Sequence, residues 1–381
     1  MTCFQRFYLM NILINCSNLK KGGGLQVADS ICCYLNMFPS HHFTVVLSSY
    51  MDNTAERIKF YDNIKVVRYD ISNAIKTIAF GRDSMLDSLV IEESIDCVLT
   101  IFGPSRWSPH CAHLCGFARA HILLLDSPYF KKMNHFRKLI HLLQNSLLKY
   151  LFKRGTTAFW TENAYITHKL QKTFKSIKSY TISNYYNQVF DEPQLQVYHK
   201  LPDFDGVSIL SVNAPYPHKN LNIAISVADF LFRKYPTFRF RFVFTVNTTE
   251  MPPIPEYLKS NFCLIDKVDV SECPSLYRQC QIMFQPTLLE CFTATYPEAM
   301  KMGLPILTTD LPFAKGLCEN AAVYYSPLDA QDCALKLYKI AVDEPFRASL
   351  LKEGQSQLSK FYDSKERANK IIDIIEKIAV R

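Results

Sequence analysis

The chain has 381 residues, too many for one ordinary core and suited to two domains of about 150–200 residues each. Apolar residues make up 48% of the sequence and charged residues 20%, a composition that excludes a disordered chain. No apolar run approaches the ~18 residues of a membrane-spanning helix. The 13 cysteines show no paired CxxC spacing, which favours reduced thiols in a cytosolic protein. The net charge of +8 favours a polyanionic surface as the binding partner of this protein. We do not expect that partner to be a nucleic acid.

Short apolar runs alternate with amphipathic stretches along the first half of the chain. The first run, "FYLMNILI", leads into "NCSNLKKGGG" rather than a cleavage site of small residues, so we interpret it as a strand and not as a signal peptide. The strands predicted here are residues 8–15, 43–49, 64–69, 96–102, 121–126 and 157–161. Such alternation is typical of a doubly wound parallel sheet.

The alternation pauses at residues 187–206, which are rich in Pro, Asp and Gln, and then starts again. The strands predicted in the second half are residues 207–213, 240–246, 282–286, 304–310 and 321–326. The chain then ends in an amphipathic helix. We therefore predict an α/β protein of two Rossmann-like domains, 1–190 and 191–361, with ligand at the carboxyl ends of the strands.

The stretch "LLECFTATYPEAMKMGLPILTTD", residues 288–310, carries two glutamates with seven residues between them. Glu290 is predicted in the loop that follows a strand. Glu298 is predicted in the first turn of a short helix, with Pro297 where a missing N–H costs nothing. Both carboxylates are therefore expected beside the ligand cleft.

The start of this short helix is a candidate anion site. The free N–H groups of Thr293, Ala294 and Thr295 would bind the phosphates of a nucleotide sugar, and the two acids would bind hydroxyls of ribose and sugar. An alternative needs no ligand, because Thr295-x-x-Glu298 is also the pattern of a capping box. Glu290 would then be a solvated loop acid.

A second candidate lies in "LSVNAPYPHKNLNIAISVADFL", residues 210–231, where a strand ends in a proline-rich turn and Lys219 is predicted to open a helix. A lysine aimed at the cleft can neutralise charge on a departing diphosphate. The helix macrodipole disfavours a cation at this position, which indicates that an anion is expected there. The alternative is a solvated lysine in a first helical turn.

Three glycines, Gly22 to Gly24, link the first strand to the first helix and allow the backbone to approach a ligand closely. The GxGxxG fingerprint is absent, so a plain flexible turn is the alternative.

Residues 102–121 are interpreted as a loop, in which Arg106 stands among His110, His113 and His121. This loop could bind an acceptor. The spacing of its histidines does not match a zinc site, and any one of them is more typical of a structural residue.

Positive charge concentrates between residues 127 and 190, where eleven Lys and Arg accompany one acid, Glu162. Within this region, residues 131–155 combine basic residues with an apolar stripe at helical spacing, made of Phe136, Ile140, Leu143, Leu147 and Leu151. The pattern suits a helix that lies on anionic lipid. The alternative is a core-packed helix with a solvated basic face.

Together these residues resemble glycosyltransferase family 4, the retaining nucleotide-sugar transferases of GT-B fold, of the bacterial polysaccharide-assembly type. The resemblance is strongest over residues 207–326, where Glu290, seven residues and Glu298 are followed by "AMKMGLPILTTD". It implies two Rossmann-like domains facing across a cleft, with the terminal helix 362–381 crossing back onto the first. It also implies that no metal or other cofactor is needed.

The resemblance implies a role for each candidate in the second domain. Glu290 would lie beside the transferred sugar as the catalytic residue, Glu298 would bind the ribose hydroxyls, and Lys219 would bind the diphosphate. The N–H groups at 293–295 would bind the same phosphates. The backbone near Val268 would contact the base.

In the first domain, Gly23 and Gly24 would approach the phosphates from the other side of the cleft. The family commonly carries an arginine five residues before the lysine, a place that Ala214 occupies here. Arg106 is a candidate source of the missing positive charge.

The sequence thus predicts a retaining glycosyltransferase that moves a sugar from a nucleotide-diphosphate donor to a glycan acceptor. The acceptor is expected to be lipid-linked, as in O-antigen, lipopolysaccharide or capsule synthesis, and the protein to contact the inner face of the cytoplasmic membrane. Two alternatives stay open, a GT-B nucleotide-sugar epimerase and a non-catalytic homologue that docks on a membrane or a partner transferase. The arginine missing at Ala214 favours the non-catalytic homologue, whereas Glu290, Glu298 and Lys219 argue against it.

Overall fold

The structure is a computed structural model that describes residues 9–20, 22–72, 75–131 and 133–379. It divides into two compact units, of which unit 1 comprises Met1–Leu123, Asn134–Asn184 and Tyr362–Arg381, and unit 2 comprises Leu124–Met133 and Tyr185–Phe361. The division between residues 184 and 185 precedes the boundary predicted at 190, and the terminal helix is counted with unit 1. Some predicted positions lie outside the described residues, namely Tyr8 of the first strand, Lys132 of the basic stretch and the last two residues of the terminal helix.

Unit 1 is built on a parallel sheet that has seven strands among the described residues, in the order β3-β2-β1-β4-β5-β6-β7. The strands are β1 (Asn11–Cys16), β2 (His42–Leu47), β3 (Ile64–Arg68), β4 (Cys97–Thr100), β5 (Ala112–Gly116), β6 (Ala158–Thr161) and β7 (Lys178–Thr181). The central strands β1 and β4 are buried almost throughout, as the continuous apolar runs of a sheet covered on both faces require. The strand order reverses between them.

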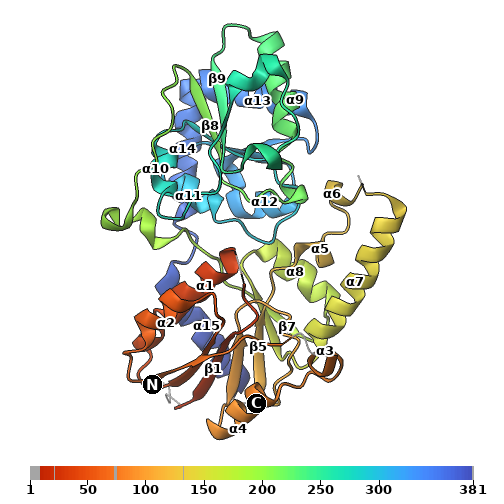
Figure 1. Cartoon of the computed structure of the whole chain (residues 1–381), viewed down its shortest axis with the longest axis vertical. Helices are drawn as coiled ribbons and strands as arrows, with labels where there is room; N and C mark the ends of the chain where they lie inside the picture. The colour runs from red at the N-terminus through yellow and green to blue at the C-terminus, as the bar shows by residue number, and fades with distance from the viewer. Residues whose placement is uncertain (1–8, 21, 73–74, 132, 380–381) are drawn as a thin grey trace, which may run out of the picture. The chain divides into compact units, whose positions relative to one another are not determined.

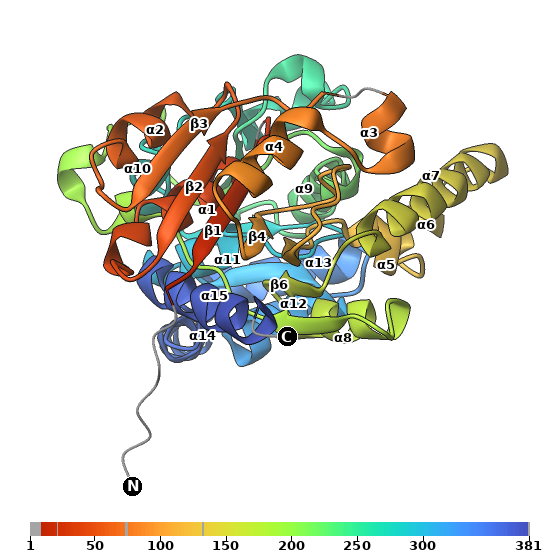
Figure 2. The same ribbon diagram turned by 90° about the horizontal axis from the view of Figure 1, so that it is seen from below.

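The helices of unit 1 are α1 (Gly23–Cys32), α2 (Asp52–Ile58), α3 (Ile75–Phe80), α4 (Ser84–Glu92), α5 (Ala120–Leu123), α7 (His135–Lys153), α8 (Ala164–Thr173) and α15 (Ser364–Ala379), with the 3₁₀ turn η1 (Leu35–Met37). Side chains of Asp83, Asn134 and Asn163 cap α4, α7 and α8 by accepting hydrogen bonds from backbone N–H groups. The last helix, α15, comes from the end of the chain and lies beside α1, β4 and β5 (Figure 1, Figure 2). Its isoleucines Ile371 and Ile375 complete the core that also holds Ile12 and Ile14 of β1.

Unit 2 repeats the same topology with a parallel sheet of six strands within the described ranges, ordered β10-β9-β8-β11-β12-β13. The strands are β8 (Val207–Ser211), β9 (Phe240–Phe244), β10 (Phe262–Leu264), β11 (Ile282–Gln285), β12 (Ile306–Thr309) and β13 (Ala322–Tyr325). This is the Rossmann order, and it reverses between β8 and β11. In such sheets ligands bind outside the carboxyl ends of the strands at the point of reversal.

The helices of unit 2 are α6 (Pro128–Lys131), α9 (Ile223–Lys234), α10 (Cys273–Arg278), α11 (Thr295–Lys301), α12 (Pro312–Cys318), α13 (Ala330–Val342) and α14 (Glu344–Leu358). The 3₁₀ turns are η2 (Gln188–Phe190), η3 (Pro193–Leu195), η4 (Pro217–Lys219), η5 (Thr248–Glu250), η6 (Glu256–Asn261) and η7 (Glu319–Ala321). Phe240, Phe242, Phe244 and Phe284 fill the core between the sheet and its helices.

Two predicted elements of unit 1 are wrong. Strand β5 runs through residues 112–116, inside the stretch that we predicted to be a loop. The predicted strand 121–126 instead begins with the end of helix α5, because a short apolar run does not distinguish a strand from a helix. Strands β7 and β10 were not predicted, and both are short with half-buried or exposed positions.

Candidate active site

Two of the predicted site residues meet at the point where the sheet of unit 2 reverses. Lys219 follows β8 and Glu290 follows β11, and the ammonium Nζ of Lys219 lies 2.5 Å from the carboxylate Oε1 of Glu290. Their side chains are only 14% and 12% exposed. The sequence indicated each residue separately, and the fold brings them together as a nearly buried ion pair.

The two loops that carry this pair are bonded to each other. The hydroxyl of Thr287 lies 2.9 Å from Oε1 of Glu290 and 3.3 Å from the carbonyl oxygen of His218. The backbone N–H of Leu288 donates to the same carbonyl of His218 at 2.8 Å. The position of Glu290 relative to Lys219 is therefore fixed by backbone as well as by charge.

The prediction that Lys219 opens a helix is wrong. Lys219 is the last residue of the 3₁₀ turn η4, which begins at Pro217, and helix α9 begins only at Ile223. Asn220 follows with a left-handed φ of 53°, a conformation that asparagine tolerates and that interrupts the helical path. The helix-macrodipole argument therefore does not apply to Lys219, and its carboxylate partner explains its position instead.

A group of amides and hydroxyls at the strand ends was missed by the sequence analysis. Gln285, the last residue of β11, donates to the hydroxyls of Thr295 at 2.9 Å and Thr293 at 3.2 Å. The amide of Asn213 donates to Gln285 Oε1 at 2.5 Å. Both amide residues stand at the carboxyl ends of predicted apolar strands. A polar residue at such a position is the sequence feature that could have predicted them as site residues.

Two buried amide atoms next to this group have no hydrogen-bond partner among the described residues. They are Oδ1 of Asn213 and Nδ2 of Asn220. Buried polar atoms are usually paired, so these two amides are exceptions to that pattern.

Glu298 lies in the first turn of α11, as predicted, and it is buried. Its Oε2 accepts a hydrogen bond from the hydroxyl of Tyr277 at 2.7 Å. Burial raises the pKa of Glu298 to about 7, although the Tyr277 hydrogen bond acts in the opposite direction. The capping box is not formed, because α11 starts after Ala294 and the hydroxyl of Thr295 bonds to Gln285. The capping box proposed as the alternative for Glu298 is therefore wrong, and the contact of Glu298 with a ribose stays a prediction.

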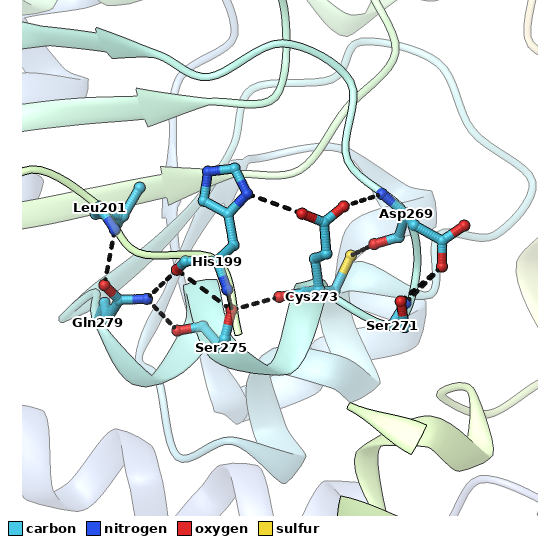
Figure 3. A network of polar contacts seen from close by, with 8 residues as sticks. His199, Leu201, Asp269, Ser271, Cys273, Ser275 and Gln279 are labelled. Carbon is cyan, nitrogen blue, oxygen red and sulfur yellow. Dashed lines mark hydrogen bonds and ion pairs between the residues drawn. The ribbon is translucent and has the colours of Figure 1, made fainter. Parts of the chain in front are cut away.

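The loop that carries Val268 connects β10 to α10 and is fastened to the linker that enters unit 2 (Figure 3). The ring of His199 lies 2.9 Å from one carboxylate oxygen of Glu272, and the backbone N–H of Asp269 donates to the other at 2.7 Å. The hydrogen bond from His199 is the main reason that the pKa of Glu272 is lowered. The backbone beside Val268 is thus held in place, and its contact with a base stays a prediction.

The glycine candidates lie in unit 1, at the start of α1. Gly22 has φ 76° and is the residue that needs to be glycine for conformational reasons. A Cβ atom added at Gly23 would meet no atom within 4 Å, and one added at Gly24 would make ordinary contact with Leu19. Since the packing of the chain does not require glycine at 23 or 24, close approach of a ligand remains a prediction for both.

Arg106 also lies in unit 1, in the loop after β4, with φ 65° and a carbonyl that accepts from Arg154 at 2.5 Å. Its role as the replacement for the arginine absent at Ala214 stays a prediction. His113, from the same predicted loop, lies on β5 with Thr100 at 2.9 Å and the carbonyl of Gly155 at 3.0 Å on its two ring nitrogens. Burial lowers the pKa of His113 to about 4, so it is a neutral structural histidine.

Helix α7 covers most of the basic stretch and exposes most of its apolar stripe. Phe136, Leu143 and Leu147 are 71%, 65% and 51% exposed, whereas Leu151 near the end of the helix is buried. In both views α7 lies at the margin of unit 1 (Figure 1, Figure 2). This exposure contradicts the alternative of a core-packed apolar face. Among the helices that the structure describes, none has the length and apolarity to cross a membrane.

The architecture defines the fold class. Two Rossmann-like units with parallel sheets give the GT-B fold, and solved structures match nearly the whole chain. Sucrose-phosphate synthase from Thermosynechococcus elongatus matches with a TM-score of 0.68 and 11% identity, over 98% of this chain and 100% of that chain. The Anabaena protein HepE in complex with UDP and glucose matches with a TM-score of 0.61 and 12% identity, over 97% and 100%. WaaG, a glycosyltransferase involved in lipopolysaccharide biosynthesis, matches with a TM-score of 0.64 and 12% identity, over 96% and 99%.

A comparison with models of protein families adds a match within unit 2. Residues 203–357, which lie in unit 2 and include Lys219, Glu290 and Glu298, match the family described as Glycosyl transferases group 1. Over these residues the second unit is therefore similar to a glycosyltransferase group 1 domain. The search of curated proteins returned no match.

Proposed function

We propose that the protein is a retaining glycosyltransferase of family 4 that moves a sugar from a nucleoside diphosphate sugar to a hydroxyl of a glycan acceptor. The observation that carries the proposal is the Lys219–Glu290 pair, 2.5 Å apart and nearly buried where the strand order of unit 2 reverses. A ligand that reaches this pair meets both charges in a place where water screens them weakly. The structure of the similar protein HepE in complex with UDP and glucose supports a nucleotide-sugar donor.

The residues have distinct proposed tasks in the transfer. The bond between the sugar and the diphosphate breaks, so negative charge grows on the departing phosphate oxygen, and the ammonium group of Lys219 stabilises it. Glu290 then turns from Lys219 toward the sugar, where its carboxylate positions the hydroxyls and supports positive charge at the anomeric carbon. The oxygen of the acceptor hydroxyl forms the new bond to that carbon with retention of its configuration, and the hydroxyl proton passes to the departing phosphate oxygen. The N–H groups at 293–295 bind phosphate oxygens, and Glu298 binds the ribose hydroxyls.

We further propose that the acceptor is lipid-linked and that α7 holds the protein on anionic lipid at the inner face of the cytoplasmic membrane. The exposed apolar stripe of α7 would enter the headgroup region, while Arg137, Lys149 and Lys153 attract the anionic headgroups. A lipid-linked glycan, such as an O-antigen or capsule precursor, would be presented at that surface.

The first experiment is a thermal-shift and turnover panel on the purified protein with UDP, GDP, dTDP and their sugars. One diphosphate should raise the unfolding midpoint, because a ligand at a hundred times its Kd adds about 2.7 kcal/mol to stability. The shift should vanish in Lys219→Ala and persist in Lys336→Ala, a control that removes a half-exposed lysine paired with Asp332 on α13.

Product analysis separates the remaining alternatives. Nuclear magnetic resonance of the product should give the same anomeric configuration as the donor. An epimerase would instead change a ring stereocentre of the free nucleotide sugar without an acceptor. A protein that no nucleotide stabilises, even with lipid vesicles present, would be a docking homologue, and the proposal would fail.

A further inference from the structure

Unit 2 contains one piece of chain that comes from the first half of the sequence, which we name the crossing segment, residues 124–133. The chain leaves unit 1 after α5, forms the short helix α6, and returns to unit 1 as α7 begins. Ser127 stands immediately before α6, and its hydroxyl oxygen accepts the N–H of Tyr129 at 3.2 Å. Pro128 then occupies the first helical position, so the conformation around Ser127 is well defined.

The crossing segment is bonded to the loop that carries Glu290. The hydroxyl of Ser127 donates to the carbonyl oxygen of Leu288 at 2.6 Å, across 161 residues of sequence. Ser127 is 7% exposed and Leu288 is 2% exposed, so water competes poorly for this bond. Glu290 follows Leu288 by two residues, and the N–H of Leu288 already donates to the carbonyl of His218.

The same segment contacts the loop that carries Lys219. The ring of Tyr129 stands edge-on to the ring of His218, with centroids 6.1 Å apart and an interplanar angle of 84°. The ring of Tyr216 also stacks with the ring of His218, with centroids 5.7 Å apart and an interplanar angle of 8°. His218 immediately precedes Lys219, so the aromatic group sets the backbone from which the lysine extends.

We propose that Ser127 and Tyr129 are positioning residues for the Lys219–Glu290 pair, an inference that rests on the proposed transferase function. Ser127 fixes the Glu290 loop by holding the carbonyl of Leu288. Tyr129 fixes the Lys219 turn by its contact with His218. The geometry of the pair therefore depends on a segment that lies more than eighty residues before either charged residue in the sequence.

The test compares Ser127→Ala with Ser127→Thr and with Ser208→Ala. Ser208 is a matched control, because it is buried in the same unit and its hydroxyl accepts from Arg241 at 2.9 Å, at the opposite end of β8. Ser127→Ala should lower kcat about tenfold or more while donor KM changes by less than about twofold. The reason is that a small displacement of catalytic groups slows the chemical step more than it weakens donor binding. Ser127→Thr keeps the hydroxyl and should restore most of kcat.

Hydrogen exchange provides a readout that does not depend on activity. The peptide spanning residues 286–292 should exchange faster in Ser127→Ala than in wild type or Ser208→Ala. If the wild-type protein turns over no nucleotide sugar, the proposed function fails, yet this exchange still tests whether Ser127 positions the loop. Unchanged exchange in 286–292, or equal loss of kcat in Ser127→Ala and Ser208→Ala, would overturn the inference.

Tyr129 variants give an independent test. Tyr129→Phe keeps the ring edge against His218 and should retain wild-type kcat. Tyr129→Ala removes the ring and should lower kcat with little change in donor KM. Equal kcat in the two variants would show that the aromatic contact does not position Lys219.

Discussion

Lys219 and Glu290 neutralise each other, so a ligand must compete with one charge to reach the other. A diphosphate is suited to this competition because its two phosphates offer several anionic oxygens to a single ammonium group. In the transfer that we propose, phosphate would replace Glu290 at Lys219 and the carboxylate would become available to the sugar. Binding of the donor and release of the Glu290 carboxylate would then be the same event.

Glu298 provides a prediction about pH. Its pKa is raised from 4.5 to about 7 by burial, so between these values the native protein binds more protons than the unfolded chain. The stability that protonated Glu298 contributes is complete below pH 4.5 and is lost as the pH rises through about 7. Replacing it in Glu298→Gln should flatten the dependence of Tm on pH in this window, which calorimetry between pH 4 and 8 measures.

Wild type and Glu298→Gln should differ in slope and not only in Tm. Glu162 in unit 1, whose pKa burial also raises to about 7, keeps part of the slope in the variant and serves as an internal reference. Parallel curves for the two proteins would mean that the pKa of Glu298 does not differ between the native and the unfolded protein.

Helix α7 gives a prediction at the scale of one element. Its buried side is held by Asn145, which donates to the carbonyl of His121 at 3.0 Å, and by Leu151 and Phe152. The exposed leucines do not contribute to that packing, so changing them should alter stability by only about 0.5 kcal/mol. The double variant Leu143→Glu/Leu147→Glu should therefore remain folded and lose binding to anionic vesicles.

The matched control is Gln144→Glu, which adds negative charge at an exposed polar position of the same helix. Co-sedimentation with vesicles that contain phosphatidylglycerol should show at least tenfold weaker binding for the double variant than for the control. Equal binding of the two variants would mean that the apolar stripe does not enter the lipid surface.

The sequence predicts elements better than it predicts contacts. Its long apolar runs identified the central strands of both sheets, where burial on both faces leaves few alternatives. It failed at β5, a short strand interrupted by a polar residue, His113, that finds its partners on Thr100 and Gly155. The sequence analysis placed Glu298 correctly, because Pro297 and Gly303 mark the start and the end of its helix.

The contacts of the candidate site were beyond reach for a different reason. The Glu290 position was readable from its loop, but its pairing with Lys219 depends on how β8 and β11 sit side by side. The bond from Ser127 to Leu288 joins two loops of unrelated sequence, and no local pattern indicates it. The periodicity of apolar residues in a sequence indicates whether a residue is buried or exposed. It does not indicate which distant residue a side chain contacts, because such contacts depend on how the strands are arranged in the sheet.

At the scale of the molecule, the stability of unit 1 depends on a buried charge brought by the last helix. Arg367 of α15 is 1% exposed and donates to Asn184 and Ser30, and its charge opposes the raised pKa of buried Glu162. Arg367→Met should destabilise unit 1 by about 3–5 kcal/mol, since it leaves Glu162 buried without its counter-charge. The double variant Glu162→Gln/Arg367→Met should recover much of that loss.

The sequence supplies a selective probe for this prediction. The two tryptophans, Trp107 and Trp160, both lie in unit 1, so urea unfolding followed by tryptophan fluorescence reports on that unit. A double variant that is no more stable than Arg367→Met would assign the effect to packing and not to charge.

The position of α15 also decides the order in which a newly made chain can fold. Ser30 and Arg367 are 337 residues apart, so at roughly 5–20 residues per second a ribosome needs roughly 20 to 70 seconds to deliver the partner of Ser30. During that time the sheet face that will receive the isoleucines of α15 stays exposed to solvent. Chaperones can bind such transiently exposed apolar surface. Every residue of unit 2 emerges before α15 does. The later half of the polypeptide can therefore reach its native state while the earlier half is still waiting for its final helix.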